Sequence, residues 1–383
     1  MKKFFAILLC AVMVFALVAC TSTQTPETPE SSTPEVDASE ESSTPDASEE
    51  SSTPEPDTTV EAEYKLGMGI VVSMASSATN NAQVDATVAT VVLDAEGKIV
   101  ACRIDVAQNK MNVAEGAVDT AATFKTKMEK GDEYGMAGKV DNDGNGVMLE
   151  WYEQTKAFEA YVVGKTAADV EAIETQFVNG HYIAVDEALL GAGCSMQITD
   201  FIAAVVKACK DEQGMAFKTA DTFTLGLAAK TSAAESTAAT ADAQAVVKMY
   251  SDFAATVVAN GKILAALNDA IQPNITVGAE GEIVNASYKA TKRELKEEYG
   301  MTPAVNYGMD PNGDGVVKEW YVQSELFSKY VVGMTAAEVA GIETAANSIG
   351  YQMSTDADLV AAGCTIQITA IKAVVAQAAN YAR

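Results

Sequence analysis

The apolar positions divide the chain into three regions. Phe4–Val18 is an unbroken apolar run of fifteen residues, which has the length of a signal-peptide core and is too short to cross a bilayer with margin. From Thr21 to Ala62 apolar residues almost disappear, so this stretch has nothing to offset the entropy of folding. From residue 63 onward, apolar positions recur with the periods of strands and helices.

The first part of the folded region has the pattern of a β-hairpin. Thr87–Leu93 is rich in β-branched residues, Ala95–Lys98 has turn composition, and Ile99–Val106 is again strand-like. Helical spacing follows, and Thr166 is placed to cap a short helix before a closing helix over Phe201–Cys209. Strands followed by helices predict an α+β fold, in which helices cover one face of an antiparallel sheet.

The folded region consists of two copies of this pattern. About 320 residues are too many for one ordinary core, and motifs recur in the same order at a spacing of about 165 residues. The matching segments are Ala95–Ile99 with Ala259–Ile263, Asp105 and Gln108 with Asp269 and Gln272, Glu133–Met136 with Glu298–Met301, Glu150–Tyr152 with Glu319–Tyr321, Tyr161–Gly164 with Tyr330–Gly333, and Ala192–Ser195 with Ala362–Thr365. We therefore expect two tandem modules, module 1 over 63–215 and module 2 over 221–383.

The stretch before the modules predicts a disordered stalk. It contains six of the nine prolines, twelve acidic residues and no Lys or Arg, and it repeats Glu-Ser-Ser-Thr-Pro at Glu41 and Glu50. Charge repulsion and proline content extend such a chain.

The folded region from residue 63 onward is acidic. Without the twelve acids of the stalk and the two lysines of the signal segment, it contains 41 acidic and 24 basic residues, a net charge of −17. This surface disfavours nucleic acid as a partner, and solubility is its simplest explanation.

The apolar run ends in Leu17-Val18-Ala19-Cys20, which resembles the lipobox of bacterial lipoproteins. The resemblance implies a signal peptide over 1–19, lipid attachment to Cys20 and an extracytoplasmic chain anchored to the bacterial cell membrane, with the stalk that the composition predicts then extending over 20–62. Two acyl chains hold a protein at a membrane where one does not. An ordinary signal peptide with an incidental cysteine is the alternative.

The remaining cysteines exclude several kinds of site. They are Cys102, Cys194, Cys209 and Cys364, without a CxxC spacing, and His181 is the single histidine. A zinc site or a Cys-His nucleophile pair repeated in both modules is therefore excluded. No nucleophile, base and orienting residue recur together, so an enzyme is not favoured and no catalytic residue is assigned.

The repeated Gly-Cys-Ser/Thr turns are the first candidate site. A small turn before a helix places free N–H groups at the positive helix end, which favours a phosphate; a turn that simply caps the helix is the alternative. The hairpin Val91–Val100 and these turns resemble the FMN-binding domain of bacterial membrane and surface proteins, in which a Ser-Gly-Ala-Thr turn carries the flavin phosphate. The positions that match its Gly-Ala-Thr are Gly193, Cys194 and Ser195 in module 1, and Gly363, Cys364 and Thr365 in module 2.

The resemblance implies a fold shared with these flavoproteins and FMN as the cofactor. Ala192 and Ala362 replace the hydroxyl residue that begins the family turn, and Leu189 and Leu359 replace an upstream Asp. We therefore expect flavin binding without a covalent bond, in extracytoplasmic electron transfer with a redox partner. A surface binding or adhesion protein without a cofactor, stabilised by Ca²⁺, is the second hypothesis.

Two acidic loops are the second candidate site. Oxygen-bearing side chains alternate along each loop before a Gly at position 6, as in EF-hand loops that bind Ca²⁺. The predicted ligands are Asp141, Asp143 and Asn145 in module 1, and Asp310, Asn312 and Asp314 in module 2. The closing Glu at position 12 is replaced by Tyr152 and Tyr321, and ordinary turns have the same composition.

Two further repeated features have simpler interpretations. Trp151-Tyr152 and Trp320-Tyr321 could stack on a flavin ring, but are better explained as apolar helix starts in the core. The acidic positions are Glu129, Asp132 and Glu133 in module 1, and Glu294, Glu297 and Glu298 in module 2. They are typical of a solvated helix face rather than an acid/base pair.

Overall fold

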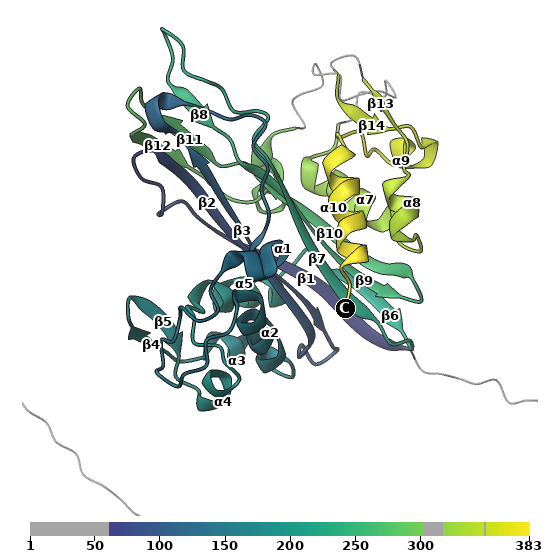
Figure 1. Cartoon of the computed structure of the whole chain (residues 1–383). Coiled ribbons are helices and arrows are strands. Elements are labelled where there is room, and N and C mark those ends of the chain that lie inside the picture. Colours follow the sequence, from purple (N-terminus) through teal and green to yellow (C-terminus); the bar gives the residue numbers. More distant parts are fainter. Residues whose placement is uncertain (1–60, 302–316, 348–349) are drawn as a thin grey trace, which may run out of the picture. The chain divides into compact units, whose positions relative to one another are not determined.

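The computed structural model describes residues 61–301, 317–347 and 350–383 (Figure 1). Cys20, the stalk up to residue 60, and the module 2 loop with Asp310, Asn312 and Asp314 lie outside these residues. Both modules belong to one compact unit, Thr58–Arg383. None of the helices in the described ranges combines the length and the apolar character that crossing a membrane requires.

Module 1 begins with three long strands and continues with short helices and a small hairpin. Its elements are β1 (Ala62–Ser73), β2 (Asn81–Leu93), β3 (Ile99–Asn112), the 3₁₀ helix η1 (Ala114–Gly116), α1 (Lys127–Lys130), η2 (Gly131–Tyr134), α2 (Trp151–Val162), α3 (Ala167–Glu171), β4 (Thr175–Val178), β5 (His181–Ala184), α4 (Glu187–Gly191) and α5 (Thr199–Cys209). The predicted hairpin, the Thr166 cap of α3 and the closing helix are confirmed.

Module 2 repeats this order with an additional small sheet. After β6 (Met215–Thr219), which connects the modules, its elements are β7 (Thr224–Ser232), β8 (Ala245–Val247), β9 (Tyr250–Ala259), β10 (Lys262–Ile271), β11 (Asn274–Val277), β12 (Ile283–Ser287), α6 (Lys292–Leu295), η3 (Lys296–Tyr299), α7 (Trp320–Tyr330), α8 (Ala336–Ala340), β13 (Thr344–Ala346), β14 (Gln352–Ser354), α9 (Ala357–Ala361) and α10 (Thr369–Asn380).

The two main sheets are antiparallel, as expected for the α+β class. Their strand orders are β3-β2-β1-β6 and β10-β9-β7. Strand β6 comes from the segment between the modules and pairs with β1, where Ala62 faces Thr219. The chain therefore completes the first sheet before it begins the second.

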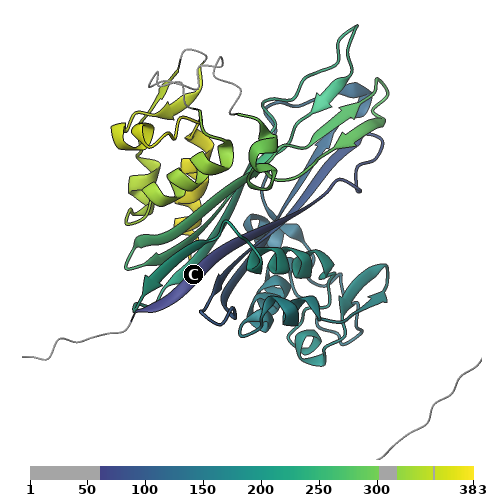
Figure 2. The same cartoon turned by 180° about the vertical axis from the view of Figure 1, so that it is seen from behind.

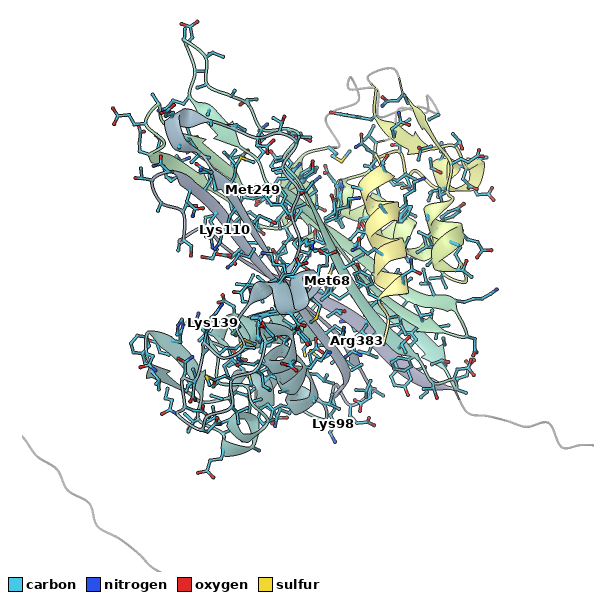
Figure 3. All side chains as sticks on the ribbon, viewed as in Figure 1. Met68, Lys98, Lys110, Lys139, Met249 and Arg383 are labelled. Atoms are coloured by element: carbon cyan, nitrogen blue, oxygen red, sulfur yellow. The ribbon has the colours of Figure 1, made fainter. Side chains whose placement is uncertain are left out.

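Both faces of each main sheet are buried. Side chains alternate between the faces of a strand, so Val84 and Val88 on β2 point into a core that both sheets share, whereas Val91 on the same strand packs under the helices of module 1. Met68 and Met249 contribute to the shared core from the two modules (Figure 3). Helices α7 and α10 cover the outer face of the second sheet (Figure 2).

Equivalent positions of the two modules make reciprocal contacts. In α5, Lys207 pairs with Glu294 of module 2 at 2.5 Å. At the same position of α10, Gln377 donates a hydrogen bond to Glu129 of module 1 at 2.8 Å. The shared core and these contacts explain why the predicted pair of modules forms one unit rather than two.

Candidate ligand-binding site

Each module holds a lysine above two aromatic rings. The ammonium nitrogen of Lys127 lies 5.0 Å from the ring centroid of Tyr134 and 5.4 Å from that of Trp151. In module 2, Lys292 lies 5.0 Å from Tyr299 and 5.2 Å from Trp320. Such cation–π contacts hold the cation over the negative face of the rings. This repeated Lys-Tyr-Trp group is the centre of the candidate site.

The short helices α1 and α6 position these lysines as their first residues. In module 2, Thr291 caps the N–H of Glu294 while the Glu294 carboxylate accepts the N–H of Thr291, a capping box. The buried Asp269 carboxylate accepts the N–H of Arg293 at 3.0 Å. A helix of four residues cannot hold its own geometry, so this cap and this carboxylate determine where Lys292 lies.

The same arrangement fixes Lys127 in module 1. Thr126 and Glu129 form the capping box, and the Asp105 carboxylate accepts the N–H of Met128 at 3.0 Å. Burial raises the pKa of Asp105 to about 6, although the hydrogen bonds that this carboxylate accepts act to lower it. Burial has the same effect on Asp269, whose pKa is also raised to about 6.

A cavity of about 670 Å³ lies beside Lys292 in module 2, and we call it the aromatic cavity. This volume is in the range of small-molecule sites. It is lined by strands β7, β9 and β10 and by the first turn of α10. Its rings come from Tyr250, Tyr299, Trp320 and Tyr351.

Among the described residues, Lys230 and Lys292 are the two cations that line this cavity, and Lys292 is the one that lies over its rings. The ammonium group of Lys292 has no hydrogen-bond or ion-pair partner among residues 61–301, 317–347 and 350–383, apart from the two rings beneath it. Asp252 also lines the cavity; burial raises its pKa to about 6, and the charge of Lys292 acts in the opposite direction. The first turn of α10, at Thr369, receives no side-chain cap. The charge of Lys292 and the positive end of helix α10 both favour a negatively charged group.

The equivalent place in module 1 differs in packing and in charge. Phe201 stands where module 2 has Ile371, and its ring packs edge-on against Trp151 at 5.9 Å. Asp85, Asp105 and Asp200 all act on Lys127 electrostatically, although burial is the largest influence and lowers its pKa. Module 2 has Ala370 at the position of Asp200, so this carboxylate is specific to the surroundings of Lys127.

The Gly-Cys-Ser/Thr turns differ from the expected phosphate site. The N–H groups of Ser195 and Met196 donate to the side-chain oxygen of Gln154 at 3.0 and 3.1 Å, and the N–H of Thr365 donates to Gln323 at 2.6 Å. The helices begin four residues later, at Thr199 and Thr369. A buried glutamine thus satisfies the N–H groups that the sequence predicted to be free.

The side chains of these turns are also enclosed. Cys194 and Cys364 are fully buried, and Ser195 and Thr365 are 1% and 2% exposed. Burial raises the pKa of both cysteine thiols to about 12. Gly193 and Gly363 have φ of +89° and +93°, the left-handed region that glycine adopts without strain. These residues have the surroundings of a packed turn.

The module 1 acidic loop has two carboxylate oxygens without partners. One oxygen of Asp141 accepts the N–H of Gly146 at 3.1 Å, and one of Asp143 accepts the amide of Asn145 at 2.6 Å. The other oxygen of each aspartate is buried and has no hydrogen-bond partner in the described part of the chain. Glu150, which follows this loop, accepts the N–H groups of Met136 and Ala137. No group of three His, Cys, Asp or Glu side chains suited to a metal occurs among the described residues.

The other predicted positions have structural roles. Trp151 and Trp320 are 2% and 5% exposed and belong to the cores under the helices. Glu133 and Glu298 form exposed ion pairs with Lys125 and Lys289. Tyr321 donates its hydroxyl to Glu297 at 2.9 Å. The four cysteines in the described ranges are free.

Comparisons of the chain with protein-family models, with curated proteins and with solved structures find no match. The site is therefore interpreted from its own residues. A sequence signal for it existed, because Thr126-Lys127-Met128-Glu129 matches Thr291-Lys292-Arg293-Glu294 between the modules. The repeated lysine of this Thr-Lys-x-Glu motif was not among the predicted site residues.

Proposed function

We propose that this chain is an extracytoplasmic binding protein whose module 2 holds a planar, negatively charged ligand without a covalent bond, with FMN as the first candidate. The observation that carries the proposal is Lys292, a cation without an acceptor beside a cavity lined with aromatic rings. Aromatic rings stack on a planar ligand, while the ammonium group of Lys292 attracts its negative charge. A bound flavin would supply redox chemistry, and the protein its position and environment.

The resemblance to FMN-binding domains, carried by the hairpin of β2 and β3, supports a flavin as this ligand. The geometry favours the aromatic cavity over the Gly-Cys-Ser/Thr turns, because the N–H groups of Ser195 and Thr365 already donate to glutamine. The lipobox-like sequence at Cys20 supports a chain anchored to the outer side of a bacterial membrane.

A titration of the purified protein with FMN tests this proposal. Flavin fluorescence should be quenched at micromolar FMN, and denaturation should release the flavin from the chain. Lys292→Met keeps the packing of the side-chain stem, removes its charge, and should weaken binding about tenfold or more. The matched control is Lys127→Met in module 1, which should leave FMN binding unchanged. Absence of binding at tens of micromolar FMN would overturn the proposal.

Calcium binding at the module 1 loop is a second proposal. The two unpartnered oxygens of Asp141 and Asp143 favour it, because a buried carboxylate oxygen without a donor is costly unless a cation compensates it. In that case the protein would be a surface binding module stabilised by Ca²⁺, with or without flavin.

A further inference from the structure

A second cavity of about 360 Å³ adjoins the aromatic cavity, and we call it the side cavity. The two cavities share Tyr250, Gln272 and Lys292 as lining residues, so they meet at these side chains. The side cavity extends from there to the start of β11, the end of β12 and helix α6. Lys292 therefore lies at the junction of an aromatic and a polar compartment.

The side cavity is positively charged within a strongly acidic chain. The sequence carries a net charge of −27, yet this cavity is lined by Lys289 and Lys292 and by no carboxylate among the described residues. Asn274, Ser287 and Tyr288 add polar groups to the lining. Lys292 without an acceptor and Lys289 in an exposed ion pair, together with hydroxyl and amide groups, match a phosphate or a carboxylate on a polar chain.

Several of these groups are available to a ligand. The hydroxyl of Tyr288 has no hydrogen-bond partner within the described ranges, and neither has the ammonium group of Lys292. Lys289 pairs with Glu298, but both side chains are exposed, and exposed pairs contribute little and rearrange readily. The Tyr250 hydroxyl donates to Asn274 at 3.2 Å, which orients this amide at the cavity wall.

We infer that the side cavity binds the anionic, polar tail of the ligand whose planar part lies in the aromatic cavity. This inference rests on the proposed function and specifies the ligand: an elongated molecule with a planar body, a polar chain and a terminal phosphate or carboxylate. The aromatic cavity holds Asp252 and Glu235 as well as Lys230 and Lys292, and its two carboxylates repel an anion, whereas no carboxylate lines the side cavity among the described residues.

Three flavins that differ only in the tail separate these compartments. Lumiflavin has the planar ring without a tail, riboflavin adds a polar ribityl chain, and FMN adds the phosphate. Their dissociation constants are measured by fluorescence titration at low and at physiological salt. FMN should bind about tenfold more tightly than riboflavin, and added salt should reduce the difference.

The double variant Tyr288→Phe with Lys289→Gln removes one hydroxyl and one ammonium group that line the side cavity and not the aromatic cavity. FMN should lose most of its advantage over riboflavin in this variant, while lumiflavin binding should stay within twofold of the parent protein. The control Lys218→Gln removes one lysine from a comparable exposed ion pair, with Glu63, on the distant strand β6. It should change no affinity.

The outcomes separate the inference from the proposed function. Equal binding of riboflavin and FMN by the parent protein, or an FMN advantage that survives the double substitution, would overturn the side cavity as the tail site and leave ring binding intact. Failure of all three flavins to bind would overturn the proposed function, and the inference with it.

Discussion

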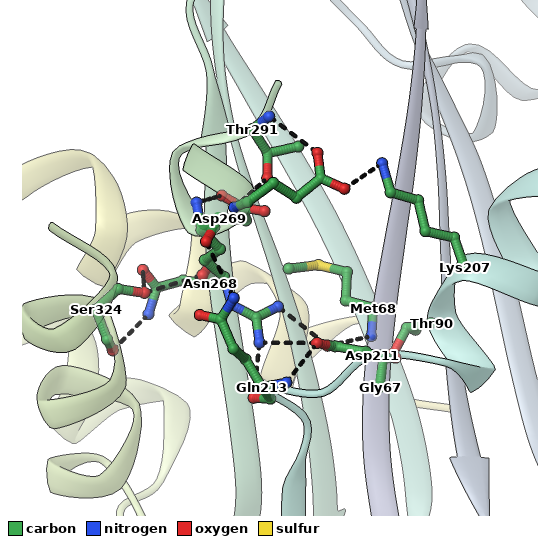
Figure 4. A network of polar contacts seen from close by, with 12 residues as sticks. Gly67, Met68, Thr90, Lys207, Asp211, Gln213, Asn268, Asp269, Thr291 and Ser324 are labelled. Carbon is green, nitrogen blue, oxygen red and sulfur yellow. Dashed lines mark hydrogen bonds and ion pairs between the residues drawn. The ribbon is translucent and has the colours of Figure 1, made fainter. Parts of the chain in front are cut away.

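The carboxylate of Asp211 receives two N–H groups from the guanidinium of Arg293, at 3.1 and 3.3 Å (Figure 4). Asp211 follows α5 of module 1, and Arg293 belongs to α6 of module 2. Their side chains are 9% and 7% exposed, and Arg293 also donates to the carbonyl of Gln213 at 2.7 Å. Because Arg293 follows Lys292 directly, this pair connects the position of the binding lysine to the contact between the modules.

Replacing Arg293 should destabilise the whole compact unit. Arg293→Met leaves the buried Asp211 carboxylate without its cationic partner, which costs about 3–5 kcal/mol in the free energy of unfolding. Asp211→Asn combined with Arg293→Met should cost less than Arg293→Met alone, because Asn keeps an acceptor for the N–H of Met68 and removes the charge. Urea unfolding measures both, and a double variant less stable than the single variant would contradict this account.

Asp105 and Asp269, which occupy equivalent positions in the two modules, should make the free energy of unfolding fall as pH rises from about 4 to 6. Both pKa values are raised from 3.8 to about 6, so the folded chain holds these protons in a range where the unfolded chain has released them. Their stabilising effect is complete below pH 4 and absent above about pH 6. Each pKa unit corresponds to about 1.4 kcal/mol, which gives roughly 2–3 kcal/mol for each carboxyl.

The test is urea unfolding at pH 4, 5, 6 and 7 for the parent protein and for Asp105→Asn with Asp269→Asn. Asn retains the side-chain oxygen that accepts the N–H groups of Met128 and Arg293. The difference between the curves therefore reports Asp105 and Asp269 together with their electrostatic effect on Glu159 and Asp252, whose pKa values their charges raise. If the free energy of unfolding changes with pH in the same way for both proteins, neither carboxyl titrates in this window.

Calcium should raise the melting temperature if the acidic loop of module 1 is a site. Ca²⁺ that binds only the folded state stabilises it by mass action. Asp141→Asn together with Asp143→Asn should abolish the increase, whereas Asp94→Asn, which changes an aspartate of the β2–β3 turn, should preserve it. A melting temperature that stays constant up to millimolar Ca²⁺ would identify the loop as an ordinary turn.

Cys20→Ala should release the chain from membranes into the soluble fraction. The substitution removes the only thiol of the lipobox-like sequence Leu17–Cys20. Without this thiol the protein cannot carry the two acyl chains that stable anchoring requires. Fractionation followed by immunoblotting measures the distribution. Membrane retention equal to that of the parent protein would exclude lipidation of Cys20 as the anchor.

The sequence predicted the repeated elements well, because their signals are local. The β-branched residues of Thr87–Leu93 and the cap at Thr166 are signals that lie within the element itself, and β2 and α3 form as expected. The shared core was not predicted. A strand such as β2, buried on both faces, reads as a continuous apolar run, and the pattern does not reveal which face meets helices and which meets a second sheet.

The candidate site was predicted less well, because it depends on contacts across the sequence. The N–H groups after Cys194 appeared free until the structure placed Gln154, 41 residues earlier in the chain, against them. Lys292 became a candidate only when Tyr299 and Trp320 were found beneath its ammonium group. The Thr-Lys-x-Glu repeat marks this position in both modules, but a repeated lysine in a charged helix normally indicates a solvated face, so the repeat alone does not identify a binding residue.

The most direct test of the central claim uses the two tryptophans of the chain, one in each module. Protein labelled with 5-fluorotryptophan should give two fluorine NMR resonances, which Trp151→Phe and Trp320→Phe assign. A planar ligand in the aromatic cavity lies against Trp320, so FMN should shift that resonance and leave the resonance of Trp151 in place. If neither resonance shifts at saturating FMN, or if only that of Trp151 does, module 2 does not hold the ligand where we propose.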